Sequence, residues 1–71
     1  MTELLIPFVG GPLDGAKFDS LGKPPENWQR LQASGGVALY RLRFENGRRV
    51  YRYDWLATKL ARAHEAAEGV R

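Results

Sequence analysis

The chain has 71 residues, no cysteine and a formal net charge of +3 at pH 7. This length predicts one small domain, whose core buries only about 60% of the surface that the unfolded chain exposes. The absence of cysteine excludes disulfide bridges and zinc sites built on thiolates. The N-terminal segment MTELLIPFVGG lacks a basic stretch and is broken by a proline, so we expect neither a signal peptide nor a membrane span. The lack of cysteine fits a cytoplasmic protein, which is the location that we expect.

Positive charge is concentrated in the second half of the chain. Residues 36–71 hold eight basic and four acidic side chains, whereas residues 1–35 hold three basic and four acidic ones. This asymmetry indicates an anionic partner, although an excess of this size is also ordinary for solubility.

The N-terminal third predicts a short hairpin. Residues 4–9 form an apolar run typical of a strand, and Pro7 should place it at a sheet edge or at a bulge because proline cannot donate a ladder hydrogen bond. The sequence GGPLDG at residues 10–15 supplies turn chemistry. Residues 16–19 can then return as a second strand.

The middle of the chain predicts a loop and a third strand. The Pro24-Pro25 pair in residues 20–27 is incompatible with a regular helix or strand. Residues 28–33 can form a helical turn or a strand, and we favour a strand because the turn-like Ser34-Gly35-Gly36 follows.

A second hairpin is expected around Asn46-Gly47. A two-residue Asn-Gly loop favours a type I′ turn, which would pair Glu45 with Arg48 and Tyr40 with Tyr53. In this register one face, the aromatic face, carries Ala38, Tyr40, Leu42, Phe44, Tyr51 and Tyr53.

The opposite face of this hairpin, the arginine face, would present a positively charged surface. It sets Arg41 opposite Arg52, a repulsive pair that Glu45 or Asp54 could relieve diagonally. A solvated face and an anion-binding face are both compatible with this pattern. The candidate partner-binding residues are Arg41, Arg43, Arg48 and Arg52. Val37, Leu39 and Val50 lie on the same face beside these arginines.

A helix is expected over residues 55–68, with Asp54 as its N-cap and Gly69 as its stop. The spacing of Leu56, Leu60, Ala63 and Ala67 predicts a stripe that faces the core and covers the aromatic face. Lys59, Arg62, Glu65 and Glu68 should then face outward.

No catalytic constellation is visible, and we expect no enzyme activity, metal or cofactor. The serines and threonines lack a neighbouring base, and GGPLDG does not match a phosphate-binding loop. His64 and Glu68 are one helical turn apart, a spacing that suggests a metal edge or a pH switch but more simply an exposed helix pair.

Two motifs together, GGPLDG after a short apolar strand and YRLRF…YRYD near the C-terminus, carry a resemblance. The chain resembles a loose group of very short, uncharacterised proteins from bacteria, notably planctomycetes and actinobacteria, and from tailed phages. The matching positions in the first motif are Gly10, Gly11, Pro12, Asp14 and Gly15. The resemblance implies a small accessory protein and no particular ligand or site.

We therefore expect an α+β fold, with an antiparallel sheet of three to five short strands and one amphipathic C-terminal helix packed on one face. The leading hypothesis is a non-catalytic interaction module that binds a protein partner or a second copy of itself, through Leu39 and Val50 or through the N-terminal strand with Leu4, Leu5 and Ile6. The alternative is nucleic-acid binding through the arginine face. An unbroken positive surface would favour the alternative, whereas arginines neutralised in pairs beside an apolar patch would favour the interaction module.

Overall fold

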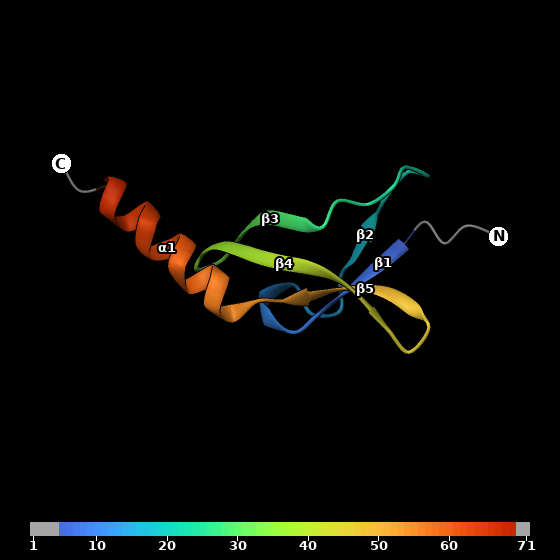
Figure 1. The fold of residues 1–71 in the computed structure, drawn as a ribbon. Coiled ribbons are helices and arrows are strands. Elements are labelled where there is room, and N and C mark those ends of the chain that lie inside the picture. The colour runs from blue at the N-terminus through green and yellow to red at the C-terminus, as the bar shows by residue number, and fades with distance from the viewer. Residues whose placement is uncertain (1–4, 70–71) are drawn as a thin grey trace.

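The chain folds into one curled sheet with a helix at one end (Figure 1). The structure is a computed structural model that describes the backbone of residues 5–69 and the side chains of residues 5–67. The elements are β1 (Leu5–Val9), a 3-10 turn η1 (Gly11–Leu13), β2 (Lys17–Asp19), β3 (Trp28–Ala33), β4 (Gly36–Glu45), β5 (Arg48–Tyr53) and α1 (Trp55–Gly69).

The strand order in the sheet is β2-β1-β5-β4-β3. All neighbouring strands are antiparallel except β1 and β5, which pair in parallel over only two residues. The α+β class, a sheet within the predicted range of three to five strands and the single C-terminal helix are confirmed, and so is the strand at residues 28–33. The parallel pair makes the sheet mixed rather than wholly antiparallel.

The register of the β4–β5 hairpin is the one that its turn predicts. Asn46 and Gly47 both have positive φ, at 53° and 78°, as a type I′ turn requires. Glu45 pairs with Arg48, Tyr40 pairs with Tyr53, and Arg41 lies opposite Arg52. The hairpin therefore presents an aromatic face and an arginine face as expected.

The position of β1 differs from the prediction, because β1 lies inside the sheet and not at its edge. The amide of Phe8 donates to the carbonyl of Ala16 on the β2 side. Amide directions alternate along a strand, so the nitrogen of Pro7 points toward β5. The pairing with β5 starts only at Phe8, and the missing donor of Pro7 therefore interrupts no ladder.

The core lies on the aromatic face and is enclosed by the sheet itself. Ile6, Phe8, Ala38, Tyr40 and Tyr51 form the buried cluster. The sheet curls so far that the ring of Phe8 on β1 packs edge-on against Tyr40 on β4, two strands away, with 4.9 Å between centroids. The expectation that the helix covers this face was wrong, and Phe44, at 73% exposure, lies outside the core near the hairpin tip.

Two buried tyrosine hydroxyls attach both long connections to this core. The Tyr40 hydroxyl donates to the Gly10 carbonyl at 2.7 Å and accepts from the Leu13 amide at 2.8 Å. The Tyr51 hydroxyl donates to the Glu26 carbonyl at 2.8 Å. Burial raises the pKa of Tyr40 above its ordinary value. The GGPLDG turn and the 20–27 loop are thus held by strands far away in the sequence.

Helix α1 packs along the N-terminal half of β4, which extends past the end of β5. The amide of Asp54 donates to the Leu39 carbonyl, and the Leu39 amide donates to the hydroxyl of Thr58. One turn later, the Arg62 guanidinium donates to the Val37 carbonyl at 2.8 Å. Thr58 is fully buried, so the helix side that carries Thr58 and Arg62 faces the sheet.

The predicted core-facing stripe of α1 is therefore wrong, since the helix is rotated about its axis. Leu56 and Leu60 are 54% and 64% exposed, and Ala63 and Ala67 are also exposed. Arg62 and Glu65, expected to face outward, contact β4 and β3 instead. The reason is local: α1 follows β5 without a loop, and the bonds of Asp54 and Thr58 to Leu39 fix the rotation at the first turn. Because a helix turns about 100° per residue, the leucines then point away from the sheet.

The close approach of Gly11 to the core provides a test of this arrangement. Gly11 has φ +66°, and a methyl group there would lie 2.5 Å from the Tyr53 ring and 2.8 Å from the Tyr40 hydroxyl. Gly15, with φ +92°, has open space around it. We expect Gly11→Ala to lower the free energy of unfolding by about 3 kcal/mol or more, and Gly15→Ala by about 1 kcal/mol. Equal losses in urea titrations of the two variants would contradict the packing described.

Candidate functional site

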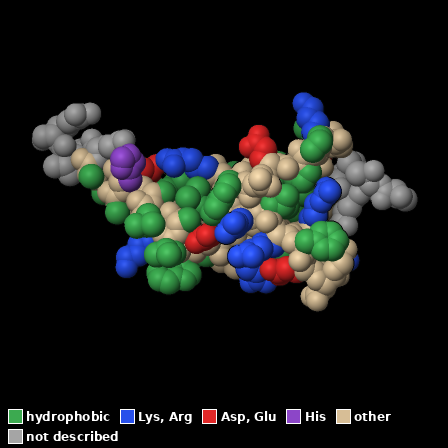
Figure 2. Space-filling model, in the orientation of Figure 1, with side chains coloured by type: hydrophobic (Ala, Val, Ile, Leu, Met, Phe, Trp, Pro, Cys, Tyr) green, Lys and Arg blue, Asp and Glu red, His purple; other side chains and the backbone are tan. Residues whose placement is uncertain are grey.

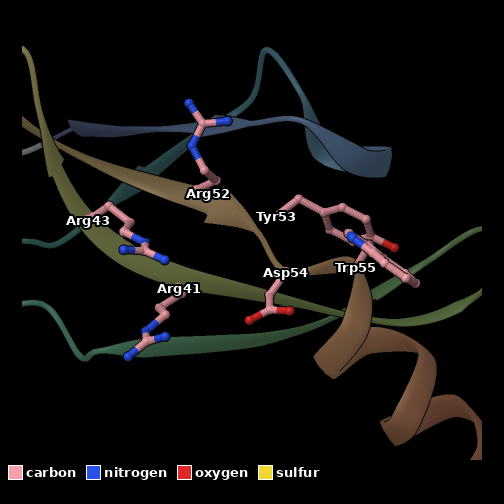
Figure 3. A pocket seen from close by; sticks show the side chains of 6 residues that line it. All are labelled: Arg41, Arg43, Arg52, Tyr53, Asp54 and Trp55. Carbon is pink, nitrogen blue, oxygen red and sulfur yellow. The ribbon is translucent and has the colours of Figure 1, made fainter.

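A shallow hollow of about 210 Å³ lies on the arginine face where β5 passes into α1. Figure 3 shows Arg41 and Arg43 reaching in from β4, with Asp54 and Trp55 on the other side. Its lining consists of Arg41, Arg43, Arg52, Tyr53, Asp54 and Trp55. The structure thus brings together three of the four predicted partner-binding residues.

Arg48, the fourth predicted residue, does not line this hollow. It lies on the arginine face but beside the Asn46-Gly47 turn, opposite Glu45 at the far end of the hairpin. The arginine face is therefore divided between a hollow near the helix and a separate charge at the hairpin tip.

Glu45 neutralises Arg52. The two side chains form a bidentate ion pair, with Nε to Oε2 at 2.7 Å and Nη2 to Oε1 at 2.8 Å. This is the diagonal relief expected for the Arg41–Arg52 repulsion. The Arg52 hydrogen bonds, together with the charges of Arg52 and Arg43, hold the pKa of Glu45 below its ordinary value.

Arg41 and Arg43 keep their guanidinium groups available. The Arg41 guanidinium lies 5.3 Å from the centre of the Trp28 ring, a cation–π contact that orients it without using its N–H groups. Among the described residues, neither arginine has a hydrogen-bonded or ion-paired partner. Asp54 shares the hollow, but one of its carboxylate oxygens accepts the Ala57 amide as the predicted N-cap.

An exposed apolar face of α1 begins at the rim of this hollow. Trp55, which lines the hollow, is 64% exposed, and Leu56 and Leu60 continue the apolar surface along the helix. Figure 2 shows hydrophobic side chains along the helix end of the molecule, with basic ones among them, and further basic side chains over the middle of the sheet. We define the helix face as Trp55, Leu56 and Leu60.

The helix face was not predicted from the sequence, because the spacing of the same leucines indicates a stripe that faces the core. The sequence did contain a signal for it. No loop separates the β5 strand from the Asp54 cap, so the rotation of the helix is tied to the strand. Of the contacts that were predicted instead, Val50 and Ile6 are buried and Leu39 is partly covered. Leu5 is 45% exposed, and Leu4 lies outside the described residues.

No metal centre or membrane-spanning helix is found in the described part of the chain. No group of three or more His, Asp or Glu side chains there could hold a metal ion. No helix of residues 5–69 is long and apolar enough to cross a membrane. The predicted His64–Glu68 pair lies outside what the structure describes, because the Glu68 side chain is not included.

Comparison of the chain with protein-family models, curated proteins and solved structures found no match.

The Glu45–Arg52 pair generates a prediction about pH. The depressed pKa means that the pair stabilises the fold above the unfolded-state pKa of Glu45, and that this contribution is lost as the pH falls through the folded-state pKa. An NMR titration should give a Glu45 pKa below 4.5, and Arg52→Gln should raise it. Arg48→Gln is the matched control, because Arg48 faces Glu45 across the strands without an ion pair in the structure. An equal rise in both variants would contradict the bidentate pair.

Proposed function

We propose that this protein is a small non-catalytic interaction module that binds another protein through the helix face. The observation that supports the proposal most directly is the exposure of Leu56 and Leu60 on a helix that has a buried polar side. An amphipathic helix normally buries its leucines. A helix that is fixed with its leucines outward has an apolar surface available for a partner.

The distribution of charge also supports this proposal over nucleic-acid binding. Glu45 pairs with Arg52 and Glu65 pairs with Arg30, whereas Asp54 shares the hollow with Arg41 without an ion pair. Two of the arginines are therefore neutralised by acids, which is the arrangement that the interaction hypothesis expects next to an apolar patch. An unbroken positive surface would have favoured a phosphate-binding role.

Helix-face substitutions test the proposal. Leu56→Ser with Leu60→Ser should abolish partner binding while changing the free energy of unfolding by less than about 1 kcal/mol, because both side chains are already exposed. Leu21→Ser with Phe44→Ser is the matched control, since these side chains are 75% and 73% exposed and belong to the 20–27 loop and to the hairpin end. Affinity capture from lysate of the source cells, quantified by mass spectrometry for all three proteins, gives the comparison.

The expected result is a set of proteins bound by the unmodified chain and by the control but not by the helix-face variant. The same set retained by all three, or nothing captured by any of them together with a strict monomer in equilibrium sedimentation, would contradict the proposal. Cell fractionation with an affinity-tagged copy of the chain would check the cytoplasmic location that the sequence predicts.

Nucleic-acid binding is the second candidate, favoured by the unpaired Arg41 and Arg43 beside two tryptophans. If it operated, the affinity for a labelled 20-nucleotide single strand would fall with salt at a log–log slope of about −2 to −3, given roughly 0.7 per neutralised phosphate and three to four basic contacts. With Arg52 and Arg30 paired with acids, Arg41 and Arg43 remain available, and two contacts at roughly 0.7 each give instead a slope no steeper than about −1.4. Fluorescence anisotropy measured from about 50 to about 300 mM NaCl distinguishes the two slopes.

A further inference from the structure

The helix face alone is too small for a stable interface. Trp55, Leu56 and Leu60, each more than half exposed, present on the order of 300 Å² of apolar surface. A standard protein interface covers roughly 800 Å² on each partner. A partner that covers the helix face must therefore also cover adjoining surface.

The adjoining surface at the N-terminal end of the helix face is the hollow. Trp55 belongs to both, so apolar and basic groups form one continuous strip from Leu60 through Trp55 to Arg43. Lys59, also exposed, lies between the two leucines in sequence and adds a positive charge beside them. Another hollow, about 230 Å³ along the 20–27 loop, is lined by both Lys23 and Glu26, and the helix face does not adjoin it.

Within the strip, Arg41 and Arg43 set the charge that a partner must bring. The two side chains leave β4 on the same face, two residues apart, and Arg41 is oriented by Trp28. Arg52 is occupied by Glu45, and Asp54 accepts the Ala57 amide through one carboxylate oxygen, so the two available guanidinium groups outnumber the one carboxylate of Asp54. A guanidinium with free N–H groups is suited to bind a carboxylate through two parallel hydrogen bonds.

We propose that the strip formed by the hollow and the helix face binds an acidic amphipathic peptide segment of a partner protein. Apolar side chains of the segment cover Leu56 and Leu60, and an Asp or Glu carboxylate enters the hollow between Arg41 and Arg43. This inference rests on the proposed function and specifies the chemistry of the partner. A nucleic acid would supply the negative charge but would leave the leucines uncovered.

A dodecapeptide library displayed on phage and selected on the immobilised protein tests the inference. We expect the enriched peptides to combine acidic residues with Leu, Ile, Phe or Trp at neighbouring positions. The most enriched peptide, labelled with fluorescein, is then titrated by anisotropy. We expect Arg41→Gln with Arg43→Gln to weaken binding of this peptide about tenfold, because the double variant loses two exposed charge-assisted hydrogen bonds.

Two controls isolate the hollow from general charge. Arg48→Gln with Arg49→Gln removes the same charge at the hairpin end, outside the hollow, and should change the affinity less than about threefold. A peptide with Lys in place of its acids should bind the unmodified protein weakly and the Arg41→Glu/Arg43→Glu protein better. Circular dichroism checks that every variant is folded.

The outcomes separate the inference from the proposed function. Enriched peptides that are apolar and neutral, or equal losses in the two arginine variants, would overturn the inference and leave the helix-face proposal standing. A dimer in sedimentation equilibrium that Leu56→Ser/Leu60→Ser dissociates would overturn it in favour of a second copy. A selection that does not enrich acidic peptides, together with an oligonucleotide that displaces the selected peptide, would overturn the inference in favour of nucleic acid.

Discussion

The fold depends on two buried aromatic residues, Tyr40 and Tyr51, whose rings both pack against Phe8 in the core and whose hydroxyls bond to two different segments. A buried tyrosine must place its hydroxyl against a hydrogen-bonding partner. Here the partners are backbone groups of the two irregular segments, residues 10–15 and 20–27. Among the described residues no buried side-chain nitrogen or oxygen lacks a partner. The core of this small protein therefore orders its loops as well as its strands.

Because the core closes within the curled sheet, the helix does not cover it. It is attached through polar contacts instead: the Thr58 hydroxyl, the Arg62 guanidinium and the Arg30–Glu65 ion pair. The exposed leucines and the hollow next to them both follow from this division of roles. The candidate site forms where β5, β4 and α1 meet, at the point that fixes the helix rotation.

Short-range chemistry made much of this structure predictable. The Asn46-Gly47 turn and the alternation around it determine the register, the two faces and the opposition of Arg41 and Arg52. The N-cap at Asp54 was likewise readable from its neighbours. Contacts between distant segments were not: the parallel pairing of β1 with β5 and the bonds from Thr58 to Leu39 depend on how the chain returns on itself. The structure accordingly brings three of the predicted arginines to one hollow, whereas the prediction that the neighbouring leucines face the core was wrong.

The hydrogen bonds from α1 to β4 have a consequence for assembly. Residues 36–39 of β4 extend beyond β5, so one edge of this apolar stretch would otherwise be unpaired. The helix occupies that edge, and its side chains bond the Leu39 amide and the Val37 carbonyl in place of a strand. Exposed edges of this kind are templates for adding strands from other molecules. A partner that pulled α1 away from the sheet would expose this edge to pairing with strands of other molecules, so the helix protects the edge as well as offering a surface for binding.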